Sequence, residues 1–410
     1  MTSRAVTVGL GAVYVAASTV APLVLKTTPS DLDVYSWPSA ETVVAGHPLL
    51  IYSTASHAVF NDNGPVGLIP LLPIAALANV LGWAGSLTGR AALTGAVASL
   101  IVLLLAYQAV GFIATARGGV RRPLAVACAV LLAPALWFAI IDYGHVEQPI
   151  ELCLVLLAMT SFLSERNALT GIALGAAVLT RTIAGFCAIP LVLAPLAARR
   201  FRPTATVAAA AVITIGVGIA PFVMADAQSA THSLVTYRGD LPISGGSFWV
   251  IARDGPWASL VRNGDVYFGA AVAIALVAIT LRRNPGVAST HTGVIGLVTM
   301  ASCCFPLFAK TVFPYYLLEP YVLAAIWWLA RPGTARNWRA VVPVLLTLDV
   351  FIVKAALISP DSAWGLVASL VSSATVGVAL ALVTVDLLRS AESALPANAA
   401  MSGATVHDAT

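Results

Sequence analysis

Long apolar runs separated by short polar segments set the pattern of this chain. A run of about 20 apolar residues is long enough to cross a hydrocarbon core roughly 30 Å thick as a helix. The candidate spans are residues 5–25, 91–115, 123–141, 150–163, 168–180, 183–198, 204–223, 266–281, 292–309, 312–330, 340–359 and 364–388. The pattern therefore predicts an all-α polytopic membrane protein with about twelve transmembrane helices.

One pair of spans allows two interpretations. Residues 168–180 and 183–198 are each short for a full crossing. They form either one long tilted helix or two half-length helices that meet at Arg181. We prefer the half-length helices, because they keep the charge pattern of the flanking loops.

Residues 64–83 are apolar enough for a thirteenth crossing. A crossing there would move every later basic loop to the opposite side of the membrane. We therefore expect this segment to be re-entrant or to lie along the interface, sheltered by protein or a cavity. Regular helix within it is interrupted by Pro65, Pro70 and Pro73.

The composition supports a membrane protein. Of the 410 residues, 59% are hydrophobic and 10% are charged, whereas a soluble domain carries roughly 25% charged residues. The first apolar run is longer than the roughly 7–15 residues of a signal peptide, and no polar cleavage region follows, so we expect a retained span. The five cysteines fall within apolar runs without the spacing of a zinc site, which predicts small buried residues.

The charged residues are distributed unevenly between the two predicted sides of the membrane. Most basic residues lie in the loops 117–122, 164–167, 198–203, 282–286 and 331–339, which the positive-inside rule places in the cytoplasm together with both termini. The extracytoplasmic side then receives Asp31, Asp33, Glu41, Asp62, Asp142, Glu147, Asp226, Asp240, Asp254, Asp265 and Asp361. These assignments predict a multi-pass protein of the cell membrane.

The same pattern divides the chain into a membrane domain and a tail. The domain covers residues 1–392 and includes two large outer loops, residues 26–90 and 224–264. Residues 393–410 are small and polar, which predicts a disordered cytoplasmic tail.

Two acids begin the first outer loop. Asp31 and Asp33 cannot share a helical face at a spacing of two, but both can approach one cavity from an extended or turn-like segment. Alternatively, Ser30 or Asp31 caps a short helix over residues 32–46 and the other acid is solvated. Pro38 favours a break inside such a helix.

The next outer loop, residues 142–149, is polar for a short turn. It contains Asp142, His145, Glu147 and Gln148, which are either solvated or part of a site. Carboxylates and one imidazole suit a hard cation, but no cluster of His and Cys supports a zinc site.

Two basic residues are predicted to lie at membrane depth, where an ionisable side chain costs free energy. Arg181 stands between the half-length spans, and Lys310 follows an apolar run. Near the outer headgroup boundary, Arg grips a phosphate with two hydrogen bonds and Lys binds it as a point charge. The alternative is that both snorkel to lipid phosphates. Tyr315 and Tyr316 either line the same cavity or belong to an interfacial belt.

The segments "DLDVYSW", "AGHPLLIYS" and "FNDNGPVGLIPLLPIAAL" follow the first span in this order. This start resembles the polyprenyl-phosphate-sugar-dependent glycosyltransferases of the GT-C superfamily, most of all the mannosyltransferases of phosphatidylinositol mannoside and GPI-anchor synthesis. In those enzymes a carboxylate stands three residues before a Val-aromatic pair, the position that Asp31 holds before Val34 and Tyr35. The residues "FNDNGP", which lead into the proline-containing apolar segment, differ from the aromatic-Pro-Pro sequence at this place in related enzymes.

The resemblance implies inverting transfer of a sugar, most simply mannose, from a polyprenyl phosphate to a lipid-linked or cell-envelope glycan on the extracytoplasmic face. Asp31 would be the general base, with Asp33, Asp142 and Glu147 as second or supporting acids. Arg181 and Lys310 would bind the donor phosphate. The sugars would contact His145, Gln148, Tyr35, Tyr315 and Tyr316. No cofactor is required, a divalent metal is optional, and no nucleic acid partner is implied.

A lipid-linked glycan flippase or transporter has the same composition. We expect such a protein to carry charged residues deep within several spans, whereas the predicted spans apart from Arg181 are interpreted as nearly charge-free. A non-catalytic scaffold would not need outward acids and bases at matching depth. The transferase is therefore the preferred hypothesis.

Overall fold

Helices form every named element in the described part of the protein. The computed structural model describes residues 3–26, 28–53, 61, 63–117, 123–330 and 337–389. Short π-helical and 3₁₀-helical turns join the α-helices, and one isolated β-bridge links Ser244 to Thr311. Asp62, the predicted tail and much of the basic loops 117–122 and 331–339 lie outside the described residues.

The first half of the chain forms ten α-helices in the described residues. They are α1 (Ser3–Leu25), α2 (Trp37–Val44), α3 (Pro65–Leu68), α4 (Leu71–Leu81), α5 (Leu87–Arg117), α6 (Pro123–Leu131), α7 (Pro134–Trp137), α8 (Glu147–Leu163), α9 (Asn167–Thr180) and α10 (Gly185–Ala197). Four short turns join them: η1 (Leu32–Ser36), η2 (Pro48–Leu50), η3 (Phe138–Tyr143) and η4 (Thr182–Ala184).

The second half continues the same architecture. Its α-helices are α11 (Phe201–Ala225), α12 (Ala227–Thr231), α13 (Tyr237–Asp240), α14 (Ala258–Arg283), α15 (His291–Phe308), α16 (Leu318–Ala330), α17 (Val341–Ile358) and α18 (Ala363–Arg389). The turns are η5 (His232–Thr236), η6 (Phe248–Ala252), η7 (Pro285–Ser289), η8 (Pro314–Leu317) and η9 (Asn337–Ala340).

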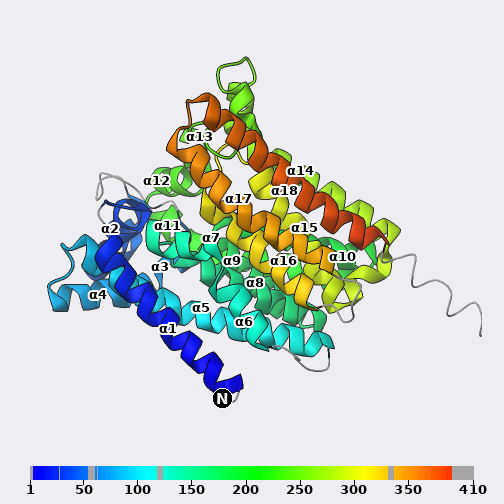
Figure 1. The fold of residues 1–410 in the computed structure, drawn as a ribbon, viewed down its shortest axis with the longest axis horizontal. Coiled ribbons are helices and arrows are strands. Elements are labelled where there is room, and N and C mark those ends of the chain that lie inside the picture. The colour runs from blue at the N-terminus through cyan, green and yellow to red at the C-terminus, as the bar shows by residue number, and fades with distance from the viewer. Residues whose placement is uncertain are drawn as a thin grey trace, which may run out of the picture.

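The long helices run roughly side by side. In Figure 1, α1, α14, α17 and α18 run from upper left to lower right, and the short helices α2, α12 and α13 lie at the upper left. Helix α1 begins at the bottom of the view and α18 ends at its right side (Figure 1). Which face of the bundle is cytoplasmic stays a prediction.

The prediction of twelve spans is not confirmed. Among the described residues, seven helices are long and apolar enough to cross a membrane: α1, α5, α11, α14, α15, α17 and α18. An eighth span results if α6 is counted together with residues 134–143, which follow it after a 46° bend. Helices α8, α9, α10 and α16 coincide with predicted spans but have only 17, 14, 13 and 13 residues.

The packing distinguishes central from peripheral helices. Helix α15 is buried over most of its length and contacts α10, α14, α16 and α18. Helix α11 instead exposes apolar side chains, including Val212, Val217 and Met224. A surface of this kind is unfavourable in water and suits lipid. The fold is therefore that of an all-α multi-pass membrane protein.

The expected break at Arg181 is confirmed. Helix α9 ends at Thr180, Arg181 adopts an extended conformation with φ −147° and ψ 131°, and α10 starts after one 3₁₀ turn. The break carries the Arg181 side chain into the interior, where only 8% of its surface is exposed.

Residues 64–83 form two short helices rather than one. Helix α3 ends at Leu68 and α4 begins at Leu71, with Pro70 directly before it. Helix α3 lies against α8 and α9, and a Cβ added at Gly64 would stand only 1.8 Å from the carbonyl oxygen of Leu179. Glycine is therefore required at this contact, which fixes α3 beside the break at Arg181.

Candidate functional site

The two acids of the first outer loop have different environments. Asp33 is buried: its Oδ2 accepts hydrogen bonds from the Ser30 backbone N–H (3.0 Å) and hydroxyl (3.1 Å), and its Oδ1 accepts from Arg90 Nε (3.0 Å). Asp31 precedes the π turn η1 and makes no capping hydrogen bond. Its side chain is 31% exposed. Asp33 thus holds the loop together, while Asp31 is available to a ligand.

Asp31 is linked to the second outer loop through an imidazole. His145 Nε2 lies 3.2 Å from Asp31 Oδ2, and His145 Nδ1 is hydrogen-bonded to Glu147 Oε1. The Tyr315 hydroxyl donates to the same Asp31 Oδ2 at 3.4 Å. Both contacts fall on Oδ2, so within the described residues no hydrogen bond occupies Asp31 Oδ1.

The backbone brings these groups together at a glycine. The π turn η3 ends at Gly144, whose φ of +74° is in the left-handed region that favours glycine. A Cβ at this position would stand 2.5 Å from Cβ of Leu32 in η1. Gly144 therefore permits the close approach of the two loops that places His145 beside Asp31.

His145 is a cation at neutral pH. Burial lowers its pKa, but the Glu147 carboxylate and the hydrogen bonds to Asp31 and Glu147 outweigh burial and raise the pKa from 6.5 to about 9. A protonated imidazole donates from both ring nitrogens, so His145 donates to the side chains of Asp31 and Glu147 and holds them in place.

Arg181 lies close to Glu147 and to two further acids, Glu319 and Glu151. Its Nη1 is 3.9 Å from Glu319 Oε1, and it interacts electrostatically with Glu147 and Glu151 as well. Gln148 donates from Nε2 to the Tyr315 carbonyl (2.9 Å) and to Glu319 Oε1 (3.2 Å). Nη1 of Arg181 makes no hydrogen bond. This buried cation therefore retains a donor for an anion.

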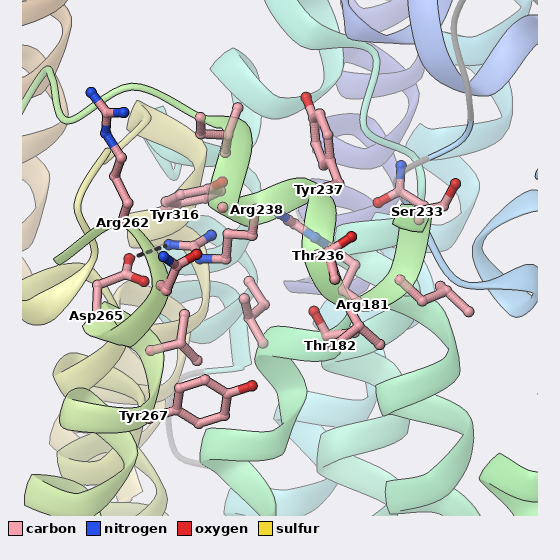
Figure 2. A pocket seen from close by; sticks show the side chains of 18 residues that line it. Arg181, Thr182, Ser233, Thr236, Tyr237, Arg238, Arg262, Asp265, Tyr267 and Tyr316 are labelled. Carbon is pink, nitrogen blue, oxygen red and sulfur yellow. Dashed lines mark hydrogen bonds and ion pairs between the residues drawn. The ribbon is translucent and has the colours of Figure 1, made fainter. Parts of the chain in front are cut away.

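A cavity of about 510 Å³ opens in front of Arg181 (Figure 2). Arg238 lines it from the other side, is held by Asp265 at 3.2 Å, and has a buried Nε without a hydrogen-bond partner. The Cζ atoms of Arg181 and Arg238 lie 5.7 and 5.9 Å from the Tyr316 ring centroid. Two guanidinium groups with unused donors thus flank one aromatic ring inside one cavity.

The lining of this cavity also includes a third cation, Arg262, and Tyr237, whose hydroxyl contacts Tyr35 outside the lining. Arg262 also lines the cavity, is exposed, and extends away from the other two arginines in Figure 2. The Tyr237 hydroxyl donates to that of Tyr35 at 3.2 Å. An anionic group with a polar substituent fits this lining better than an apolar ligand does.

Asp31 lines a separate cavity of about 280 Å³ at the end of α1. The Lys354 Nζ, which is 2.8 Å from Asp142 Oδ2, and the Lys26 Nζ, which donates to the Asp142 carbonyl at 3.1 Å, lie in its wall. Tyr315 touches Asp31 through its hydroxyl and lies with its ring centroid 5.4 Å from Arg181 Cζ. It therefore stands between the two cavities.

The predicted site residues fall into two groups. The structure brings Asp31, His145, Glu147, Gln148, Arg181, Tyr315 and Tyr316 into one cluster. Asp33, Asp142, Tyr35 and Lys310 lie nearby with other contacts. Nζ of Lys310 donates to the carbonyls of Gly239 (3.0 Å) and Arg262 (2.7 Å), and the residue is not in the lining of the arginine cavity. Burial lowers the pKa of Lys310 to about 8, against the opposing effect of Asp265.

A metal centre finds no support within the described ranges. No group of three or more His, Cys, Asp or Glu side chains there is placed to hold a metal ion. The one imidazole of the cluster is occupied by two carboxylates.

Several charged members of the site were not predicted from the sequence. Arg238 and Arg262 belong to the predicted outer loop 224–264. Cations are rare on the predicted outer side, and this signal, which drew attention to Arg181, could also have identified them. Glu151 and Glu319 are ionisable groups within apolar runs, a signal that alone indicates a site.

The expectation of nearly charge-free spans is therefore wrong. Helices within the described residues bury Glu151, Glu319, Asp349 and Asp386 to 8% exposure or less. The charge pattern thus does not argue against a transporter, and other features have to separate it from an enzyme.

Apolar helices around a buried polar centre define an all-α polytopic membrane protein. No protein-family model matches the chain, and no curated protein matches it. The activity has to be argued from the site itself.

Proposed function

We propose that this protein is a membrane glycosyltransferase that moves a sugar from a polyprenyl phosphate to a hydroxyl of a lipid-linked or cell-envelope glycan. One observation carries this function: an accessible carboxylate and an arginine-lined cavity lie on the two sides of Tyr315. A base and an anion site that contact the same tyrosine supply the two parts that this reaction needs.

The arginine cavity suits the donor phosphate. Arg181 and Arg238 each keep an unused N–H, so a phosphate oxygen can accept from both without breaking a hydrogen bond. Their ion pairs with Glu319 and Asp265 fix the guanidinium groups before substrate arrives. Donors fixed in advance stabilise the charge that develops on the leaving phosphate. In this proposal Arg238, rather than Lys310 as expected from the sequence, binds the donor phosphate together with Arg181.

The cavity at Asp31 suits the acceptor. Asp31 Oδ1 takes the proton of the acceptor hydroxyl as its oxygen attacks the anomeric carbon of the donor sugar. The bond from that carbon to the phosphate oxygen breaks, and its electron pair stays on the phosphate. Attack from the side opposite the phosphate inverts the anomeric centre. The polar wall with Lys26, Asp142 and Lys354 suits hydroxyl groups.

His145 and Glu147 position the base. The contact with His145 Nε2 fixes Asp31 Oδ2, which leaves Oδ1 for the acceptor hydroxyl. The reaction takes place at the extracytoplasmic face in this proposal, since the basic loops predict that side for the cluster. Mannose is the first donor sugar to test and arabinose the second.

A lipid-linked glycan flippase is a second candidate. Glu147, Glu151 and Glu319 surround a single arginine in the interior, and buried acids of this kind occur in the proton relays of transporters. A flippase moves its substrate without making a new bond, so the formation of a covalent product separates the two candidates.

A transfer assay in detergent tests the enzyme. Purified protein receives radiolabelled polyprenyl-phosphate mannose, or the arabinose donor, together with a cell-envelope lipid extract. We expect a new labelled glycolipid, with a rate that falls at least tenfold for Arg238→Gln. Arg253→Gln is the matched control, because Arg253 lies in the same outer loop and pairs with Asp254 and Asp361 outside the cavity. Failure to form product from either donor, or equal rates for both variants, contradicts the proposal.

A further inference from the structure

A third cavity lies away from the candidate site. Its volume is about 240 Å³, and its lining includes Asn284, Thr292, Gly293, Arg339 and Asp386. These residues come from the end of α14, the beginning of α15, the turn η9 and the last turns of α18. None of the residues assigned above to the donor or acceptor lines it.

The cavity is at the opposite membrane face from the arginine cavity. Asp265 lines the arginine cavity and Asn284 lines the third, with helix α14 between them. At a rise of about 1.5 Å per residue, the nineteen steps from residue 265 to residue 284 span roughly 28 Å. This is close to the thickness of a hydrocarbon core, roughly 30 Å.

Arg339 supplies a buried, unused donor to this cavity. The residue is 1% exposed, and its Cζ lies 4.7 Å from the ring centroid of Trp327 and 5.7 Å from that of Trp338. Its Nε donates to Asp386 Oδ1 at 3.1 Å, and Nη2 donates to Oδ2. Nη1 has no hydrogen-bond partner. A buried donor without an acceptor is costly, so its retention points to a ligand.

The first turn of α15 supplies further donors. Thr290 caps this helix by accepting from the Gly293 N–H at 3.0 Å. The N–H groups of His291 and Thr292 have no acceptor within the helix. The positive end of the dipole of an eighteen-residue helix thus meets the guanidinium of Arg339 in one cavity.

We propose that this third cavity binds a phosphate group. Phosphate matches two convergent sets of donors, since its oxygens accept from a guanidinium and from backbone amides together. Arg282 and Arg283 end α14 beside it and add positive charge. The phosphate belongs either to a lipid headgroup of the adjacent leaflet or to a soluble ion. This site does not depend on the proposed function.

Binding is tested on the full-length protein in dodecyl maltoside micelles. Inorganic phosphate is titrated at constant ionic strength against sodium chloride, and the midpoint of thermal unfolding is followed. A second titration uses phosphatidylglycerol, with diacylglycerol as the control that lacks a phosphate. A ligand that binds only the folded state raises the midpoint in a saturable way.

The test variant is Thr292→Asp. An acid in the first turn favours the helix dipole, so the fold is retained, while its carboxylate repels an incoming phosphate. Thr204→Asp places the same change in the first turn of α11, outside the three cavities. We expect Thr292→Asp to raise the half-saturating ligand concentration at least tenfold and Thr204→Asp to leave it unchanged.

Each result has one meaning. Stabilisation by inorganic phosphate that Thr292→Asp weakens supports a site for a soluble ion. Stabilisation by phosphatidylglycerol alone, again weakened, supports a headgroup site. If neither ligand stabilises the wild type, or if both variants respond as it does, the phosphate site is refuted.

Discussion

Replacing Asp31 by Asn removes one negative charge and leaves the size of the side chain almost unchanged. The Asn oxygen can still accept from His145 Nε2 and the Tyr315 hydroxyl, now at 3.2 and 3.4 Å from Oδ2. The fold should therefore survive. An amide cannot take a proton from the acceptor, and loss of a general base typically lowers the rate about 10²–10⁴-fold. The corresponding rise in activation free energy is about 3–5 kcal/mol.

Asp33→Asn is the matched comparison, with the opposite outcome. The Asp33 carboxylate accepts from Ser30 and forms an ion pair with Arg90 Nη2 at 2.8 Å, at a side-chain exposure of 4%. An amide cannot balance the charge of Arg90. Removing one partner of a buried ion pair costs about 3 kcal/mol of folding free energy. The folded fraction should retain a transfer rate within about tenfold of the wild type.

The assay measures both quantities on the same preparations. Initial transfer rates are normalised to folded protein, which is quantified by size-exclusion chromatography, and unfolding midpoints are recorded in parallel. We expect a low rate at a normal midpoint for Asp31→Asn, and a near-normal rate at a lowered midpoint for Asp33→Asn. Retained activity in Asp31→Asn, or the same loss of rate in both variants, would refute the assignment of the base.

Two further predictions concern stability. Because folding raises the pKa of His145 from 6.5 to about 9, its protonation contributes about 3 kcal/mol. This contribution is complete below pH 6.5 and is lost as the pH rises through about 9, so the stability gap between wild type and His145→Gln in denaturant unfolding should shrink over that window. A constant gap would disprove the shift. Gly64→Ala should lower the unfolding free energy by about 3 kcal/mol, because its Cβ would meet the Leu179 carbonyl at 1.8 Å. Gly85→Ala, which has open space, should change it by less than about 1 kcal/mol; similar values for both would contradict the contact.

Local patterns predicted much of the helical framework. The break at Arg181 followed from two short apolar runs around one charge, and the structure has it there. The interruption of residues 64–83 followed from their prolines. The number of spans did not follow, because hydropathy marks an apolar run but not the residue at which its helix ends. Helix α8, for example, begins at Glu147, three residues before the predicted span 150–163.

Sequence patterns identified many residues of the site but not the contacts that distinguish one candidate from another. Asp31 and Asp33 look equivalent along the chain, and the difference between them comes from Arg90 and His145, which lie 57 and 114 residues away. Arg238 could not be recognised from its sequence neighbours either, because an arginine in a polar loop is usually solvated. Its role depends on its approach to Tyr316, which only the fold reveals.

The close packing around the buried polar cluster is an argument for the transferase that we propose over the flippase. A transporter has to move its binding site between the two faces of the membrane. Here Gly64 and Gly67 press α3 against Leu179, Thr180 and Glu147 so closely that no Cβ fits without a shift. The acids beside Arg181 are therefore attached to a wall that cannot slide without losing this contact. A transferase needs such fixed charges, because preorganised donors stabilise the leaving phosphate without reorganisation. Gly67→Ala should therefore lower the transfer rate together with the unfolding midpoint.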